Sequence, residues 1–166
     1  MGVMVESEKN VFRESGLTYS QLVEGATYEF PGLTVTAAHV VDFGGLCGDH
    51  NPLHMDEEWC KRNSLFETRV AHGTLTLALV MGPLGPLLQG TALAMLGIRF
   101  SCPRPVRLDD SVYRSAKVVA KVDSTKRSGG RVTFELSGRN HHHEEVFEGE
   151  VTIMVADTVM SGKPAS

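Results

Sequence analysis

The sequence of 166 residues has few cysteines, no excess of positive charge and no long apolar run. Its three cysteines, Cys47, Cys60 and Cys102, show no CxxC spacing, which argues against a disulfide framework and a thiolate zinc site. Sixteen basic and twenty acidic residues give a net charge of −4, which argues against general nucleic-acid binding. The longest apolar stretch, residues 75–88, is broken by two Gly-Pro pairs and is shorter than the ~20 residues of a membrane span.

The N-terminus also lacks a targeting signal. Residues 1–20 mix charged and apolar side chains without the continuous apolar core of a signal peptide, so we interpret them as an extension. This feature and the cysteine spacing predict a cytoplasmic protein. Residues 158–166 are small and polar, which predicts a disordered tail. A chain of this length can bury one ordinary hydrophobic core, so we expect residues 21–157 to form a single domain.

The first part of this domain predicts one strand and then helices, separated by turn residues. Apolar residues from Thr36 onward recur at the spacing of one helix face, and a glycine suits the end of such a helix. The predicted elements are a strand over residues 22–30 ended by Pro31-Gly32, a helix from Thr36 to Leu46 closed by Gly48, a loop over residues 49–54, and a short helix over residues 56–62.

A longer helix is predicted from Gly73, and because it is apolar on nearly every side we expect it to be buried. Pro83 and Pro86 should kink or end it. The rest of the domain alternates apolar and polar residues, the pattern of strands with one solvated face. The expected strands cover residues 92–100, 112–122, 132–137 and 147–155, with hairpin turns at residues 128–130 and at Gly138 with Asn140. Together these features predict an α+β domain in which an antiparallel sheet wraps one helix.

Two titratable residues suggest chemistry in the predicted loop. Asp49 and His54 are five residues apart, with Asn51 and Pro52 between them. A tight loop can turn both side chains toward one point, and near neutral pH a carboxylate and an imidazole can act as a proton-transfer pair. The alternative is purely structural: Asp49 closes a turn and His54 is a partly buried histidine with satisfied hydrogen bonds.

Gly73 stands at the start of the apolar helix, directly after His72. The first N–H groups of a helix have no partner within it, and a glycine leaves its amide open to approach by a developing oxyanion. A His-Gly pair alone is weak evidence, since a small residue there can simply permit close packing.

These residues fall in two motifs that together resemble a known family. Residues 43–54 read FGGLCGDHNPLH, and HGTL follows at residues 72–75, eighteen residues after His54. From about Thr36 to Ala156 the sequence resembles the MaoC-like hydratases, the R-specific enoyl-CoA hydratase group with a hot-dog fold.

The resemblance implies reversible syn addition of water to an enoyl thioester, giving an (R)-3-hydroxyacyl thioester. It implies that Asp49 and His54 are the catalytic pair, that the Gly73 amide is the oxyanion donor and that Asn51 holds the loop. It also implies a homodimer, or a larger oligomer built from dimers, and no metal or other cofactor. The substrate would be carried on coenzyme A or on acyl carrier protein, and no membrane or nucleic-acid partner is expected.

Two residues depart from the family pattern. Cys47 stands where many relatives carry serine, a change that we expect to be tolerated. Met81 stands where some relatives carry a hydroxyl residue near the active site, so a secondary hydrogen bond is expected to be missing.

Other residues and functions remain as alternatives. Residues 141–145 read HHHEE, a composition that suits metal ligands, but adjacent histidines on a hairpin rarely converge on one ion, so we interpret them as a solvated turn. Arg99, Arg104 and Arg107 are candidates for contacts with coenzyme A phosphates or simply a solvated edge. The rival functions are a hot-dog thioesterase and a non-catalytic acyl-thioester-binding subunit.

Overall fold

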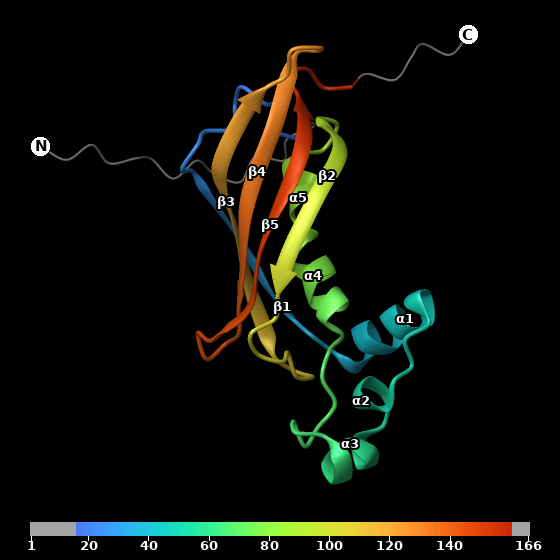
Figure 1. Cartoon of the computed structure of the whole chain (residues 1–166). Coiled ribbons are helices and arrows are strands. Elements are labelled where there is room, and N and C mark those ends of the chain that lie inside the picture. The colour runs from blue at the N-terminus through green and yellow to red at the C-terminus, as the bar shows by residue number, and fades with distance from the viewer. Residues whose placement is uncertain (1–15, 161–166) are drawn as a thin grey trace, which may run out of the picture.

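The computed structural model describes residues 16–160, so most of the predicted extension and of the predicted tail lies outside the described residues. Its main element is a five-stranded antiparallel sheet in the order β1-β3-β4-β5-β2 (Figure 1). The strands are β1 (Thr27–Thr34), β2 (Ala92–Ser101), β3 (Ser111–Asp123), β4 (Gly129–Arg139) and β5 (Glu145–Ala156). The two hairpins β3-β4 and β4-β5 form the middle of the sheet, which leaves β1 and β2 at its edges.

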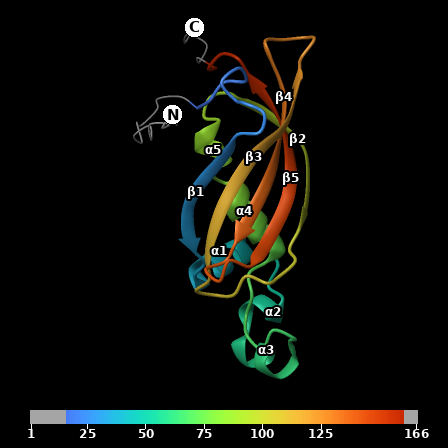
Figure 2. The same cartoon turned by 90° about the vertical axis from the view of Figure 1, so that its left-hand side faces the viewer.

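The helices form two groups. The apolar pair α4 (Gly73–Met81) and α5 (Leu84–Leu87) runs along one face of the sheet, and α4 contacts β3, β4 and β5 (Figures 1 and 2). Three further helices lie at one end of the sheet: α1 (Ala37–Cys47) beside it, and α2 (Pro52–Met55) and α3 (Glu57–Asn63) beyond it. The expectation of an α+β domain with a sheet packed around an apolar helix is therefore confirmed.

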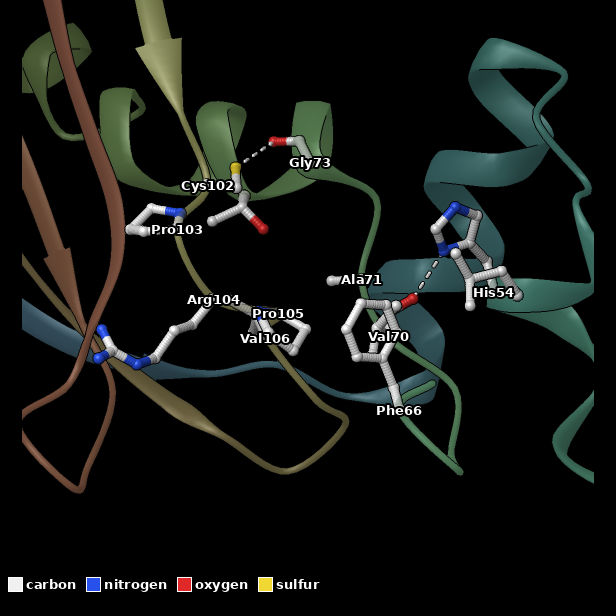
Figure 3. A pocket seen from close by; sticks show the side chains of 12 residues that line it. His54, Phe66, Val70, Ala71, Gly73, Cys102, Pro103, Arg104, Pro105 and Val106 are labelled. Atoms are coloured by element: carbon white, nitrogen blue, oxygen red, sulfur yellow. Dashed lines mark hydrogen bonds between the residues drawn. The ribbon is translucent and has the colours of Figure 1, made fainter. Parts of the chain in front are cut away.

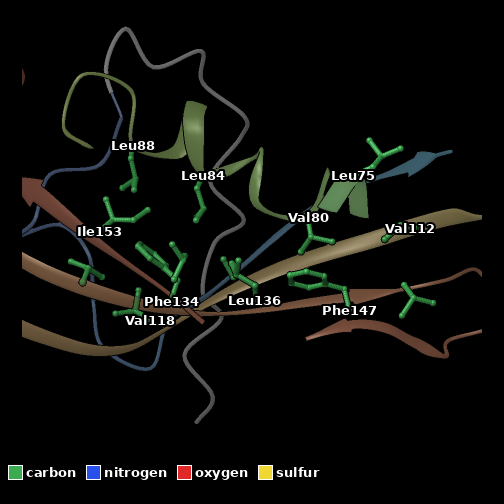
Figure 4. Packing of buried hydrophobic residues seen from close by; sticks show 14 of the residues in the cluster. Leu75, Val80, Leu84, Leu88, Val112, Val118, Phe134, Leu136, Phe147 and Ile153 are labelled. Atoms are coloured by element: carbon green, nitrogen blue, oxygen red, sulfur yellow. The ribbon is translucent and has the colours of Figure 1, made fainter. Parts of the chain in front are cut away.

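The core lies between α4 and the central strands (Figure 4). Phe134 and Phe147 are fully buried there, and Val80 of α4 is 1% exposed. Burying a side chain of this kind stabilises the fold by roughly 1.5–3 kcal/mol. A Cβ atom on Gly138 would lie 2.9 Å from Val80 Cγ2, so this glycine allows the helix to approach the sheet closely. Gly138 is part of β4 and not of a turn, which corrects the predicted hairpin position.

Two further details of the sheet differ from the prediction. β1 starts at Thr27 and runs through Pro31-Gly32 instead of ending there. The strand lies at an edge of the sheet, where a missing N–H costs no ladder hydrogen bond, and its register with β3 shifts between Phe30 and Leu33. The first hairpin turn lies at residues 124–128, because Gly129 and Gly130 already pair with β5.

The helix predictions are largely confirmed. α1 ends at Cys47, and Gly48 follows with a left-handed backbone (φ +80°). The long apolar helix is interrupted after Met81, and α5 continues it from Leu84, as the two prolines predicted. The predicted loop over residues 49–54 is wrong in its second half, where Pro52–Met55 forms one helical turn. Among residues 16–160, no helix is both long enough and apolar enough to cross a membrane.

Candidate active site

The short helix α2 carries His54, and the motif before it supplies the helix start. Pro52 is the first helical residue, where its missing N–H is not needed. The Asn51 side chain caps the helix, since its Oδ1 accepts a hydrogen bond of 3.0 Å from the Leu53 N–H. Asp49 Oδ1 in turn accepts a hydrogen bond of 3.2 Å from the Asn51 N–H. The sequence between Asp49 and His54 therefore fixes the local geometry of both side chains.

Asp49 and His54 face each other, as the sequence predicted. His54 Nε2 lies 3.9 Å from Asp49 Oδ2, and the two side chains are 11% and 52% exposed. On the other side of the ring, His54 Nδ1 lies 2.7 Å from the Val70 carbonyl oxygen. A carbonyl oxygen only accepts, so Nδ1 carries the proton, and in the neutral ring Nε2 presents a lone pair toward Asp49. A separation of 3.9 Å is too long for a direct hydrogen bond and fits a bridging water.

A second histidine, which the sequence analysis named only as the neighbour of Gly73, belongs to the same cluster. The His72 ring stacks on the His54 ring with 3.8 Å between centroids. His72 Nε2 lies 3.0 Å from the Asp49 backbone oxygen and donates to it. In the sequence, the only signal for His72 is the position of the His-Gly pair after the first motif. Its contacts are with Asp49 and His54, which lie far from it in the sequence.

Gly73 lies at the wall of a cavity of about 290 Å³ that also reaches His54 (Figure 3). It is the first residue of α4, so its N–H has no intrahelical acceptor, and no hydrogen bond within the described residues uses it. The cavity wall continues with Phe66 on one side and with residues 102–106 on the other. Asp49 and Asn51 are not among the lining residues, whereas His54, whose Nε2 lies 3.9 Å from Asp49 Oδ2, is one of them.

The cavity wall contains two polar side chains that the sequence analysis did not place in the site. Thr76, one turn along α4, is 3% exposed and its hydroxyl donates to the His72 carbonyl oxygen at 3.3 Å. Cys102 Sγ lies 3.8 Å from the Gly73 carbonyl oxygen, and burial raises the pKa of this thiol. Met81, at the far end of α4, packs against the hydrophobic core. Thr76 is therefore the hydroxyl residue of α4 that lines the cavity.

Three residues of the cluster have ligand atoms within 4.8 Å of one another: Asp49, His54 and His72. Their geometry is poor for a metal ion. Imidazole lone pairs lie in the ring plane, and the two rings are stacked at 29°, so their lone pairs run nearly side by side instead of converging. His54 Nδ1 is also occupied by the Val70 carbonyl oxygen. In the part of the chain that the structure describes, the histidine turn at residues 141–143 does not form a comparable group.

The three arginines considered from the sequence lie in different places. Arg104 lines the cavity, where its Nη1 donates to the Glu145 carbonyl oxygen at 3.2 Å. Arg99 pairs with Glu150 across the β2-β5 ladder, and its side chain is 84% exposed. Arg107 is exposed and its backbone pairs with Val70 beside the site, but it does not line the cavity. Arg104 is thus the one of the three that lines the cavity, and its side chain is half-exposed.

Comparison with known proteins identifies the family of this chain. A family model described as the MaoC-like domain matches residues 20–140. The chain belongs to the MaoC-like family. An (R)-specific enoyl-CoA hydratase of Rhodospirillum rubrum is 31% identical over 74% of this chain and 81% of its own length. A 3-hydroxybutyryl-CoA dehydratase of Methylorubrum extorquens is 28% identical over 86% of this chain and 87% of its own length.

Solved structures resemble the MaoC-like domain over most of its length. The unliganded R-hydratase PhaJ1 of Pseudomonas aeruginosa is 27% identical and has a TM-score of 0.77. The match covers 92% of this chain and 94% of the other. A Mycobacterium tuberculosis protein with a double hot-dog fold has a TM-score of 0.79 at 19% identity, over 92% of this chain and 48% of the other. The sheet packed around α4 is therefore a single hot-dog domain.

Proposed function

We propose that this protein is a hydro-lyase that adds water reversibly, and in syn geometry, to the double bond of an enoyl thioester carried on coenzyme A or acyl carrier protein. The product is an (R)-3-hydroxyacyl thioester. The relatives named as hydratase and dehydratase support this reaction class. The observation that carries the proposal is the 3.9 Å gap between His54 Nε2 and Asp49 Oδ2, at a cavity whose wall includes the free Gly73 amide.

A water molecule beside these two atoms, within hydrogen-bond distance of both, would face two acceptors. One of its protons points to the His54 Nε2 lone pair, which the Nδ1 hydrogen bond to Val70 keeps available. The other points to the Asp49 carboxylate. With both protons engaged, a lone pair of the water oxygen is left to attack Cβ of the substrate. One of the two side chains accepts the proton lost by the water, and the same side chain then delivers this proton to Cα, because neither carries another transferable proton.

The negative charge that develops during this addition lies on the thioester oxygen. Gly73 has the features of a donor to that oxygen, since no group among residues 16–160 accepts a hydrogen bond from its N–H, its position is exposed and it starts α4. The partial positive charge at a helix start adds to the effect. One preorganised oxyanion donor is typically worth about 2.7–4 kcal/mol of transition-state stabilisation.

Arg104 is the candidate contact for the substrate carrier. Its guanidinium is half-exposed and adjoins Glu144, with Nε 3.8 Å from Glu144 Oε1. Coenzyme A and the phosphopantetheine arm of acyl carrier protein both carry phosphate, and an arginine at the cavity wall suits either one.

A homodimer formed through β2 is part of the proposal. β1 is protected at its edge by Pro31 and a register shift, features that discourage pairing with another strand. β2 instead presents ten residues at an open edge and exposes Met95, Leu96 and Phe100 by 57%, 50% and 40%. Apolar exposure of this kind on an edge strand is typical of an interface.

The cytoplasmic location also remains a prediction.

The decisive experiment uses crotonyl-CoA as substrate for the purified protein. Loss of the enoyl-thioester absorbance without release of free thiol, and formation of (R)-3-hydroxybutyryl-CoA, is the expected result. Release of coenzyme A thiol would instead identify a thioesterase. An absence of turnover with both coenzyme A and acyl carrier protein substrates would favour the non-catalytic subunit and overturn the proposal.

A further inference from the structure

We propose that His72 is a positioning residue that holds the Asp49-His54 pair in its working geometry. This inference rests on the proposed function, because it concerns the same catalytic pair. His72 precedes α4, whereas Asp49 and His54 flank the start of α2. It is 2% exposed and does not line the cavity, so it acts through the two residues that it contacts and not on the substrate.

The contacts of His72 reach both members of the pair. Its Nε2–H donates to the Asp49 backbone oxygen at 3.0 Å, which fixes the backbone from which the carboxylate projects. Its ring lies against the His54 ring with 3.8 Å between centroids. Phe43 of α1 packs at a tilt against His72, 5.2 Å between centroids, and limits its movement. A shift of His72 would therefore move Asp49 and release the His54 ring at the same time.

A stabilising role in the fold does not explain why this residue is a histidine. His72 Nδ1 is buried, and it is the one buried side-chain nitrogen or oxygen of the described residues that has no hydrogen-bond partner. A buried acceptor without a partner is destabilising compared with an apolar atom at the same place. The His72 side chain also makes no capping hydrogen bond at the start of α4. The remaining use of the imidazole is its Nε2–H, in a ring flat enough to stack on His54.

Two substitutions separate the donor from the ring. In His72→Gln, the amide N–H can reach the position of Nε2–H and keep the hydrogen bond to Asp49. In His72→Phe, a ring remains against His54, but the donor is lost and so is the unpaired buried nitrogen. We expect His72→Gln to retain a kcat at least tenfold above that of His72→Phe, whose kcat should fall by about 10- to 100-fold with little change in KM.

Comparing the melting temperature with kcat separates a positioning role of His72 from a purely structural one. If His72 only stabilised the fold, activity would fall together with the melting temperature. We expect His72→Phe to melt at or above the wild-type temperature while its kcat falls. If the larger ring prevents folding, His72→Leu replaces it, with the same expected loss of kcat.

The matched control is His39→Phe. His39 Nδ1 accepts a hydrogen bond of 3.0 Å from the Thr36 N–H at the start of α1. This variant should lower the melting temperature and leave kcat unchanged. The inference is overturned if His72→Phe, or His72→Leu in its place, turns over as fast as His72→Gln, or if the variants raise KM at constant kcat. An inactive wild-type protein would overturn the proposed function itself, which keeps the two failures distinct.

Discussion

Replacement of Asp49 by asparagine is the most direct test of the proposed catalytic pair, because the change keeps the shape of the side chain and removes its charge. The asparagine oxygen can take the place of Oδ1 and still accept from the Asn51 N–H. The amide NH₂ group then takes the place of Oδ2, opposite His54 Nε2. The gap changes from two acceptors to one acceptor and one donor.

Asparagine at this position removes a possible general base, and it also changes the hydrogen bonds available to the proposed attacking water. The amide N–H now donates either to the His54 Nε2 lone pair or to the water oxygen. In the first case the imidazole can no longer accept a proton, and in the second the lone pair needed for attack is occupied. Loss of positioned acid-base catalysis typically lowers the rate by about 100- to 10,000-fold. The same loss corresponds to about 2.7–5.4 kcal/mol of transition-state stabilisation.

The assay measures kcat and KM for hydration of crotonyl-CoA together with thermal unfolding. We expect kcat to fall by the stated factor, KM to change little, and the melting temperature to stay close to wild type because the Asp49 side chain is 52% exposed. Asp56→Asn is the matched control, since Asp56 caps α3 by accepting from the Trp59 N–H at 2.9 Å and asparagine caps equally well. An Asp49→Asn variant with a kcat within about threefold of wild type would refute the role of Asp49.

Three further predictions concern the cavity and the open edge of the sheet. In Gly73→Ala, the new Cβ would lie 3.5 Å from Cys102 Sγ, which is an ordinary contact, so the protein should fold normally. The methyl group should obstruct the thioester and lower kcat/KM by tenfold or more, and an unchanged kcat/KM would contradict the oxyanion role. Leu96→Lys, at a half-exposed position of β2, should convert the dimer to monomer in analytical ultracentrifugation, and a wild-type monomer would exclude the proposed interface. Partial burial raises the pKa of the Cys102 thiol, so alkylation by iodoacetamide, followed by peptide mapping, should be slower at neutral pH than in the urea-unfolded protein, rise toward alkaline pH and be slowed by bound acyl thioester. A rate at neutral pH as fast as in the unfolded protein would contradict this environment.

The parts of the fold that the sequence predicts are those that depend on neighbouring residues. The alternation around Phe134 is visible because each strand buries one face, and the hairpins β3-β4 and β4-β5 join strands that are adjacent in the sequence. The pairing of β2 with β5 joins segments about fifty residues apart and has no local signal. Pro31 suggests the end of a strand, but a proline is tolerated within a strand at the edge of a sheet. Only the assembled sheet shows that β1 is an edge strand.

The candidate site divides along the same line. Asp49, Asn51 and His54 belong to one short motif whose hydrogen bonds are local, so their proximity follows from the sequence. His72 could not be added on the same grounds, because its contacts with Asp49 and His54 span 23 and 18 residues and arise only when two segments meet. The Thr76 hydroxyl was missed for a related reason: its place at the cavity depends on how α4 is rotated against residues 102–106.

One short segment, Val70–Gly73, connects all parts of the site. Val70 holds α2 through both of its backbone polar groups. Its N–H donates to the Leu53 carbonyl oxygen at 3.3 Å, and its carbonyl oxygen accepts from His54 Nδ1. Ala71 then donates to the Val106 carbonyl oxygen at 2.8 Å and so fixes the opposite cavity wall.

His72 and Gly73 complete this arrangement. His72 holds the Asp49 backbone, and the next residue presents the free amide that starts α4. The proposed catalytic pair, the cavity wall and the proposed oxyanion donor are thus all held by four consecutive residues. Consecutive peptide units can rotate about φ and ψ, so the positions of these groups depend on the hydrogen bonds that hold Val70, Ala71 and His72. Val70 and Ala71 act through their backbone groups, whereas His72 acts through its side chain, so the identity of the residue matters more at His72 than at Val70 or Ala71.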